Sequence, residues 1–115
     1  MIMLKEITSI EQLIQCLGIK RTLKGFQLLP CTIRLTLSDE NYFFKRMQLY
    51  EDVAKIAGTS AGCVEHNLRT AIERCWYSGN RTFLLSISPY PLSKCPSNGE
   101  FLEIMVSYCQ KMGLR

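Results

Sequence analysis

The sequence predicts an all-α fold of five or six helices in a single domain over residues 1–115, which contains a helix-turn-helix. Three observations lead to this prediction. Apolar residues recur at helical spacing in several segments. Most of these segments begin with a residue that caps helices. One segment alternates as a strand would, but no convincing partner strand appears elsewhere.

The composition is that of a globular protein. A length of 115 residues lies within the roughly 100–150 of a typical domain. With 47% hydrophobic and 21% charged residues, the chain is not of the disordered class. The net charge of +4 is compatible with a polyanionic partner but does not require one.

Nothing in the sequence indicates a membrane or an export route. No apolar run reaches the roughly 18 residues that cross a bilayer. The start, MIMLKEITSI, reaches Lys5 and Glu6 after four apolar residues, so we expect no signal peptide. The expected location is the cytoplasm, with no membrane partner.

The six cysteines indicate neither a metal site nor a disulfide framework. They form no CxxC pair, and His66 is the only histidine available to complete a metal site. We therefore expect reduced thiols that serve as small hydrophobic side chains, and we expect no metal and no cofactor. The cysteines are at positions 16, 31, 63, 75, 95 and 109.

The first helix is predicted by helical spacing of Ile7, Ile10, Leu13, Ile14 and Leu17. Ser9 and Gln12 have the spacing of a capping box, and Gly18 is a natural stop. A basic turn, KRTLKG, follows over residues 20–25.

The segment over residues 26–58 is harder to divide. Pro30 fits a first helical turn, whereas the alternation in TIRLTL over residues 32–37 would suit a strand. We favour a helix because no partner strand is evident. SDEN over residues 38–41 caps the part that follows, in which the expected apolar side consists of Phe43, Phe44, Met47, Tyr50, Val53, Ala54, Ile56 and Ala57.

The last third contains three prolines, Pro89, Pro91 and Pro96, which oppose a long helix. The apolar residues before them, Phe83, Leu84, Leu85 and Ile87, are expected to fold back onto the core. A final helix should begin near Ser97, which has capping-box spacing to Glu100. This helix should bury Phe101, Leu102, Met105, Val106 and Cys109.

The strongest local signal is LYEDVAKIAGTSAGCVEHNLRTAIERCW, which predicts a helix-turn-helix at approximately 51–78. A short helix over about 51–57, with the acidic residues Glu51 and Asp52 at its start, ends at Gly58, and a longer helix follows over about 60–77. Ala54 is small where the helices would touch, Gly58 suits a left-handed turn, and Val64 would pack back on the first helix. The alternative is a plain helical hairpin without a ligand.

Placing the second helix on a wheel of about 100° per residue separates two faces. The inner face contains Val64, Leu68, Ala71, Ile72 and Cys75. The outer face contains Gly62, His66, Arg69, Thr70, Glu73 and Tyr77, with Glu65 and Asn67 on its flanks. In DNA-bound helix-turn-helix proteins, the early outer residues of this helix reach the base edges.

The outer residues have chemistry that suits a duplex. Glu65 can accept from cytosine N4, Asn67 can pair with adenine, and Arg69 can meet guanine or a phosphate. Small residues at the start (Ser60, Ala61, Gly62) would let backbone amides approach a phosphate. Phosphate charge would be neutralised by Lys20, Arg21, Lys24, Lys45, Arg46, Arg74 and Arg81, for which the alternative is an ordinary solvated surface.

These segments resemble a known family. YEDVAK, TSAGCVEHNLRTAIERCWYSGN and PSNGEF, with LKGF at 23–26 and Ser38-Asp39, are similar to the C-terminal DNA-binding domain of the sporulation master response regulator, the stage-zero sporulation protein A family. The resemblance spans nearly the whole chain. It implies an all-helical fold that binds double-stranded DNA as tandem dimers and activates or represses transcription.

The resemblance also implies contact residues. Family members use arginine, glutamate, arginine and histidine at the positions of Cys63, Glu65, His66 and Thr70, and Arg69 matches a further family arginine. We therefore expect base contacts from Cys63, Glu65, His66 and Arg69, and phosphate contacts from Ser60, Thr70, Arg74 and Lys24. An arginine bound to guanine gives roughly 1–3 kcal/mol of discrimination, so without it the operator preference should differ.

The family regulator also carries a receiver domain, for which 115 residues leave no room. We expect an excised or standalone effector domain that is monomeric off DNA. The alternative function is a protein-interaction module that has lost specific DNA binding and modulates a full-length regulator or the transcription machinery. Catalysis is not expected, because Cys63 and His66 lack a third ligand or an orienting carboxylate.

Overall fold

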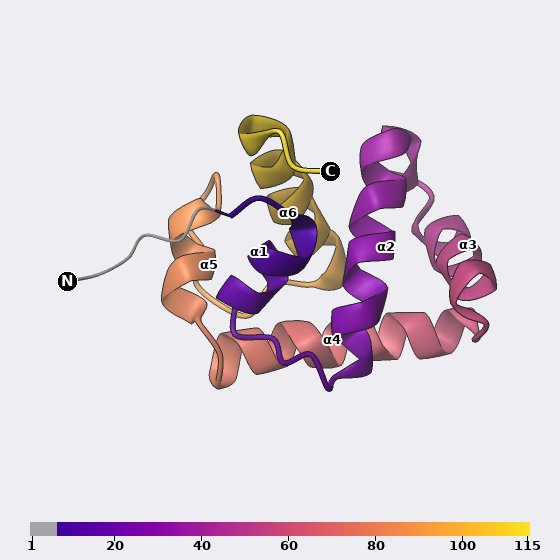
Figure 1. The fold of residues 1–115 in the computed structure, drawn as a ribbon, viewed down its shortest axis with the longest axis horizontal. Helices are drawn as coiled ribbons and strands as arrows, with labels where there is room; N and C mark the ends of the chain where they lie inside the picture. Colours follow the sequence, from indigo (N-terminus) through magenta and orange to yellow (C-terminus); the bar gives the residue numbers. More distant parts are fainter. Residues whose placement is uncertain (1–6) are drawn as a thin grey trace.

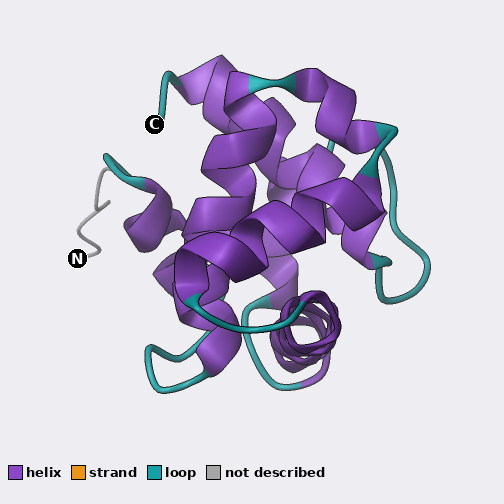
Figure 2. Cartoon of the chain, turned by 90° about the vertical axis from the view of Figure 1, so that its right-hand side faces the viewer, coloured by secondary structure: helices purple, strands orange, loops and turns teal. Residues whose placement is uncertain are grey.

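The computed structural model describes residues 7–115, and within that range it contains helices and no strand (Figure 2). The all-α prediction is confirmed. The predicted absence of a signal peptide concerns the start of the chain, of which residues 1–6 lie outside the described part. The elements are α1 (Ile10–Cys16), α2 (Lys24–Ser38), the 3-10 helix η1 (Glu40–Phe43), α3 (Arg46–Ala57), α4 (Ala61–Tyr77), α5 (Arg81–Ile87) and α6 (Asn98–Met112).

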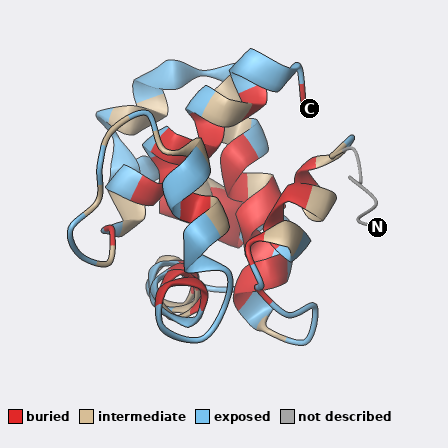
Figure 3. Ribbon diagram, turned by 90° about the vertical axis from the view of Figure 1, so that its left-hand side faces the viewer, coloured by how far each residue is buried: buried red, intermediate tan, exposed pale blue. Residues whose placement is uncertain are grey.

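Helix α4 is the longest element, and the other helices are arranged along it. In Figure 1 it lies along the lower edge, with α3 near its start and α5 near its end. Helix α2 begins at the middle of α4 and rises away from it, and α1 and α6 lie between α2 and α5. The buried residues gather where these helices meet (Figure 3). None of the helices in residues 7–115 combines the length and the apolarity needed to cross a bilayer.

The crossing of α2 and α4 depends on a glycine. A Cβ atom built on Gly25 would lie 2.6 Å from Cβ of Ala71 and 2.6 Å from the Asn67 carbonyl oxygen. Real side chains do not approach so closely, so only glycine allows the first turn of α2 to rest directly on α4. This contact fixes Lys24, the first residue of α2, beside the middle of α4.

A second close approach joins α1 to the end of α4. A Cβ atom on Gly79 would lie 2.8 Å from the Leu17 carbonyl oxygen. Asn80 then bonds in two directions: its side-chain oxygen accepts from Phe83 N and caps α5, and its Nδ2 donates to the Cys16 carbonyl 3.0 Å away. Gly79 and Asn80 therefore connect the ends of α1, α4 and α5.

The expected helix around Pro30 is confirmed, but two details of the prediction are wrong. Pro30 lies within α2, in its second turn rather than its first, and the basic turn ends at Leu23 because Lys24 and Gly25 are already helical. The strand-like alternation of TIRLTL is accommodated within the helix. Thr32 and Thr36 are buried, and their hydroxyls donate to the carbonyls of Leu28 and Thr32, each 2.8 Å away.

The predicted start and apolar side of α3 are also wrong. The helix begins at Arg46, not at Glu51, and Asp52 lies inside it, where it accepts from Tyr42 Oη and Gln48 Nε2. Asp39 caps the short η1 turn as SDEN suggested, which turns the chain before α3 begins. Phe44, Met47, Ile56 and Ala57 are consequently exposed, whereas Tyr50, Val53 and Ala54 are buried.

The remaining capping signals are largely confirmed. Ser97 and Glu100 form the reciprocal capping box at the start of α6. Ser9 caps α1 by accepting from Gln12 N, but the Gln12 side chain accepts from Thr8 N rather than from Ser9, so that box is only half formed. The predicted stop at Gly18 is confirmed by its positive φ of 78°.

The segment before α6 forms the seven-residue α5. Of its apolar residues, Leu84 is buried and Leu85 is exposed. The guanidinium of Arg81 lies 5.1 Å from the ring centroid of Trp76, a cation–π contact at the end of α4. The predicted burial along α6 is confirmed for Phe101, Leu102, Met105, Val106 and Cys109.

The six cysteines are all free thiols. Cys75 and Cys109 are fully buried, and Cys31 and Cys95 are partly buried and pack against the core, so the expectation that the thiols serve as small hydrophobic side chains is confirmed for these four. Burial raises the pKa of Cys75 to about 12 and that of Cys109 to about 11. Residues 7–115 contain no group of three or more side chains placed to hold a metal ion.

Candidate nucleic-acid interface

The turn between α3 and α4 is short and its conformation requires glycine. Helix α3 ends at Gly58, which has φ of 71°, in the left-handed region that glycine adopts without strain. The N–H groups of Gly58 and Thr59 both donate to the Ala54 carbonyl. The predicted left-handed Gly58 is confirmed, and the turn places the start of α4 at the surface.

The first turn of α4 is capped by Ser60. Its Oγ accepts from Cys63 N at 3.1 Å, and this bond does not use the hydroxyl hydrogen of Ser60. A Cβ atom on Gly62 would have nothing within 4 Å, so packing within the described chain does not account for a glycine there. The helix therefore begins with an uncrowded and exposed backbone.

The two faces predicted for α4 are confirmed. Its inner residues are buried: Val64, Leu68, Ala71, Ile72 and Cys75. Gly62, Glu65, His66, Arg69, Glu73 and Tyr77 are exposed, and Cys63, Asn67 and Thr70 are partly buried. The exposed residues form a stripe along α4. We call its two edges flanks: the first meets α2, and the second, which includes Glu65, Arg69 and Glu73, meets α3 and α6.

The first flank faces α2. Cys63 lies in a groove of about 520 Å³ that Lys24 and Gln27 of α2 line together with the turn residues Gly58 and Thr59. Lys24 therefore lies on the same side of the molecule as the first turn of α4. The groove brings together two residues predicted to contact DNA, Cys63 and Lys24, and Ser60 is linked to it through its bond with Cys63 N.

The second flank faces the starts of α3 and α6. Glu65, Arg69 and Glu73 line a groove of about 530 Å³ with Arg46 and Asn98 on its other side. Arg69 Nη2 lies 3.0 Å from Oε2 of Glu65, and both side chains are about half exposed. The structure thus brings Glu65 and Arg69 into contact, with His66 exposed beside them on the stripe.

Three other predicted residues lie farther from this group. Arg74 is exposed in the last turn of α4, and Thr70 is partly buried on the flank that faces α2. The Asn67 side chain is bonded within its own helix, because its Nδ2 donates to the Cys63 carbonyl at 2.8 Å and to Cys63 Sγ at 3.1 Å. In this position its amide nitrogen is already used, which disfavours the bidentate contact with adenine.

A comparison with protein-family models bears on this arrangement. The model described as "Sporulation initiation factor Spo0A C terminal" matches residues 10–109. The chain belongs to this family. The family is one of DNA-binding effector domains of sporulation regulators rather than of enzymes. The resemblance seen in the sequence is thereby confirmed.

The structure explains several of the residues on which the resemblance to the family rests. Val64, Ala71 and Ile72 are core residues of α4, and Gly79 and Asn80 join α1, α4 and α5. Sequence reasoning missed one contributor to the site, Asn98, whose side chain reaches α4. The sequence shows only that Asn98 directly follows the Ser97 cap in PSNGEF, and it does not indicate which residues Asn98 contacts.

Proposed function

We propose that this chain is a sequence-specific DNA-binding transcriptional regulator domain in which α4 enters the major groove. The observation that carries the proposal is the exposed stripe of α4, flanked by Lys24 on one side and Arg46 on the other. A major groove about 12 Å wide accepts an α-helix, and the cationic flanks would meet the two phosphate backbones beside it.

The contacts follow from this placement. Glu65 accepts from the N4 amino group of cytosine, and Arg69 donates to guanine or to a phosphate. His66 and Cys63 meet neighbouring base edges with weaker and shorter groups. Ser60, Thr70, Arg74 and Lys24 contact phosphates, for which a hydroxyl or a cation suffices. The uncrowded backbone at Gly62 lets the first turn of α4 come close to the duplex.

We propose an operator that differs from that of other family members. Cys63 and His66 stand where the family has arginine, and Thr70 stands where it has histidine, so three family contacts are replaced by weaker ones. Charge on the flanks still supports binding to any duplex, and this component is sensitive to salt. The expected base preference is set mainly by Glu65.

Selection from a random duplex pool tests the proposal, followed by fluorescence-anisotropy titration of the enriched duplex at several salt concentrations. We expect an enriched motif and binding that weakens as salt rises. Lys111→Ala is a matched control, because it removes one positive charge near the end of α6 that lies far from α4 in Figure 1. It should leave binding almost unchanged, whereas Arg69→Ala should weaken it.

The same titrations address assembly and the alternative function. We propose a cytoplasmic chain that is monomeric in solution and forms tandem dimers on DNA, which sedimentation with and without the enriched duplex measures. No enriched motif and no binding at low salt would contradict the proposal. They would favour an interaction module, which the loss of the two family arginines at the positions of Cys63 and His66 also supports. Co-sedimentation with a full-length family regulator would test that alternative.

A further inference from the structure

Asn98, the first residue of α6, connects three helices beside the proposed DNA-binding face. Its Nδ2 lies 3.2 Å from Oη of Tyr50 on α3 and 3.2 Å from the main-chain carbonyl oxygen of Glu65 on α4. The side chain is partly buried, and it lines the same groove as Glu65 and Arg69. A single amide group thus meets the first helix of the motif and the outer edge of the second.

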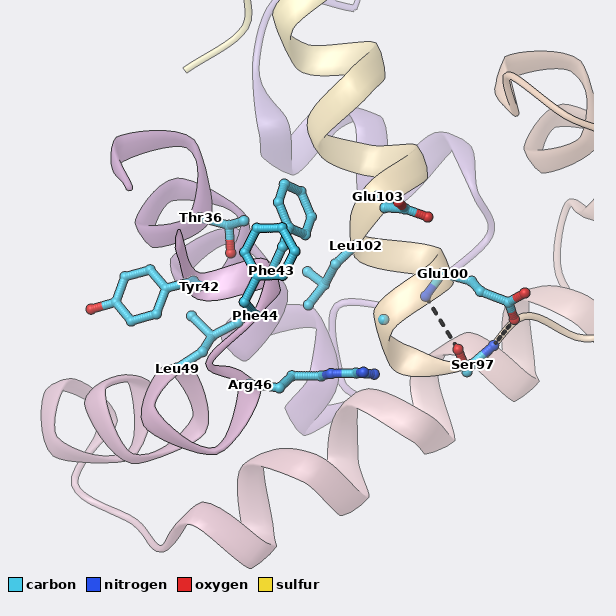
Figure 4. A pocket seen from close by; sticks show the side chains of 11 residues that line it. Thr36, Tyr42, Phe43, Phe44, Arg46, Leu49, Ser97, Glu100, Leu102 and Glu103 are labelled. Carbon is cyan, nitrogen blue, oxygen red and sulfur yellow. Dashed lines mark hydrogen bonds between the residues drawn. The ribbon is translucent and has the colours of Figure 1, made fainter. Parts of the chain in front are cut away.

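The position of Asn98 is itself fixed by the first turn of α6. Pro96 is buried, and Ser97 and Glu100 exchange the two bonds of the capping box, which are drawn in Figure 4. Arg46 extends from the start of α3 toward this turn (Figure 4), where a Cβ atom on Gly99 would overlap its guanidinium. The amide of Asn98 is therefore held at a defined place relative to both α3 and α4.

The bond to Glu65 is made with the backbone, not with the side chain that reads DNA. A carbonyl oxygen has two lone pairs, so the Glu65 carbonyl can accept from Asn98 and still serve the helix. Such a bond restrains the turn of α4 that carries Glu65 without using any group needed for a base. Base contacts depend on placement to within about 0.5 Å, so this restraint bears directly on discrimination.

We propose that Asn98 is a positioning residue for DNA recognition: it fixes α4 against α3 and α6 and so sets how Glu65 and Arg69 meet the bases. This role rests on the proposed function, since it concerns the reading of a duplex. Tyr50 takes part as the second acceptor, and the three-helix contact through Tyr50, Asn98 and Glu65 acts as one unit.

The test compares Asn98→Ala, Tyr50→Phe and the double variant with the wild type. Affinity is measured for the selected duplex and for the same duplex with the base pair preferred by Glu65 exchanged. We expect Asn98→Ala to reduce the ratio of the two affinities by about three- to tenfold, the effect of one lost hydrogen bond on placement. The salt dependence should stay as in the wild type, because no phosphate contact is removed.

Tyr50→Phe should give a smaller loss in the same direction, and the double variant should be no worse than Asn98→Ala. Ser107→Ala, an exposed change on α6, is the control and should behave as the wild type. A merely structural role predicts a lower melting temperature with the affinity ratio of the folded protein unchanged, and that result would overturn the proposal.

A second pair of variants covers the case in which Asn98→Ala does not fold. Asn98→Asp keeps the shape and places a carboxylate at a helix start, where it is favourable, but it replaces the donor by an acceptor that faces the Glu65 carbonyl. Ser107→Asp adds the same charge at an exposed position of α6 and leaves both the Asn98 amide and the Ser97–Glu100 capping box intact. Only Asn98→Asp should lower the affinity ratio, and equal ratios would overturn the role of Asn98.

The outcomes also separate the two proposals. If the wild type binds no duplex, this result contradicts both the proposed function and the role of Asn98. A wild type that discriminates between the two duplexes, with variants that discriminate equally well, removes only the role of Asn98.

Discussion

Arg69 and Glu65 form an ion pair on α4, with Arg69 Nη2 3.0 Å from Glu65 Oε2 and each side chain about half exposed. An exposed pair one helical turn apart contributes only about 0.3–0.5 kcal/mol to stability. Its significance is therefore geometric. In the unbound protein, each of these two proposed contact residues restrains the position of the other.

Arg69→Ala should weaken binding to all duplexes by a similar factor and reduce the dependence of log affinity on log salt by about one unit, if the guanidinium meets a phosphate. Anisotropy titrations of the selected and of an unrelated duplex measure both effects. A loss confined to the selected duplex would instead indicate that Arg69 reads guanine.

Glu65→Ala should relax base preference while leaving the free energy of unfolding within about 1 kcal/mol of the wild type, because an exposed pair contributes little to stability. Binding to an unrelated duplex should become tighter, since a negative charge is removed and Arg69 is released. The selected motif of the variant, determined from the same random pool, checks this. An unchanged motif would exclude Glu65 from base reading.

Gly62→Ala should have opposite effects on folding and binding. Nothing lies within 4 Å of the added Cβ, so the variant should be more stable by about 0.5–1 kcal/mol, because alanine favours a helix over glycine. Binding should weaken if the backbone at Gly62 approaches the duplex. Urea denaturation and anisotropy titration measure the two quantities, and tighter or equal binding would place Gly62 away from DNA.

Gly25→Ala is the contrasting change. The new Cβ would come within 2.6 Å of Ala71 Cβ and of the Asn67 carbonyl, so α2 must move away from α4. Overpacking of this kind lowers the free energy of unfolding by about 1–3 kcal/mol. Urea denaturation of Gly25→Ala and Gly62→Ala side by side checks this prediction. Both are glycine-to-alanine changes in a first helical turn, and only the Cβ atom at position 25 meets a neighbour.

Alkaline pH should destabilise the fold through the buried thiols. Burial raises the pKa of Cys75 to about 12 and that of Cys109 to about 11, from a value of 9.0. Above pH 9 the unfolded chain loses these protons while the folded chain keeps them, so the stabilisation is complete below pH 9 and falls as the pH rises toward the folded pKa values.

Urea denaturation between about pH 8 and pH 10.5 measures this loss. Cys75→Ala should show a flatter dependence on pH than the wild type. Leu84→Ala removes buried volume without removing a titrating group, so it should lower stability at every pH and keep the wild-type slope. Parallel curves for the wild type and Cys75→Ala would contradict the prediction.

How far the sequence predicted the molecule depended on whether a feature was local. The inner face of α4, the Ser97–Glu100 box and the turn at Gly58 follow from neighbouring residues, and all three were predicted. The start of α3 was not predicted, because Asp52 was interpreted as an N-terminal residue and serves as an acceptor for Tyr42 within the helix.

The contacts around the candidate site depended on tertiary structure. The bond from Asn98 to the Glu65 carbonyl joins residues far apart in the sequence, and the other partner of Asn98 is a tyrosine hydroxyl. Neither has a spacing that a sequence displays. The exposed Phe44 and Met47 were predicted to be buried for a related reason: their apolar character was visible, but the turn that points them outward was not.

The contact between Arg81 and Trp76 gives the protein an optical reporter. Trp76 is the only tryptophan in the chain, it is 8% exposed, and the Arg81 guanidinium covers its ring at the end of α4 that lies away from the Ser60 cap. Its fluorescence therefore follows the opening of the α4–α5 corner, where the solvent reaches the indole on unfolding. Because the ring is buried, unfolding can be monitored by tryptophan emission while a dye on the duplex reports binding in the same cuvette.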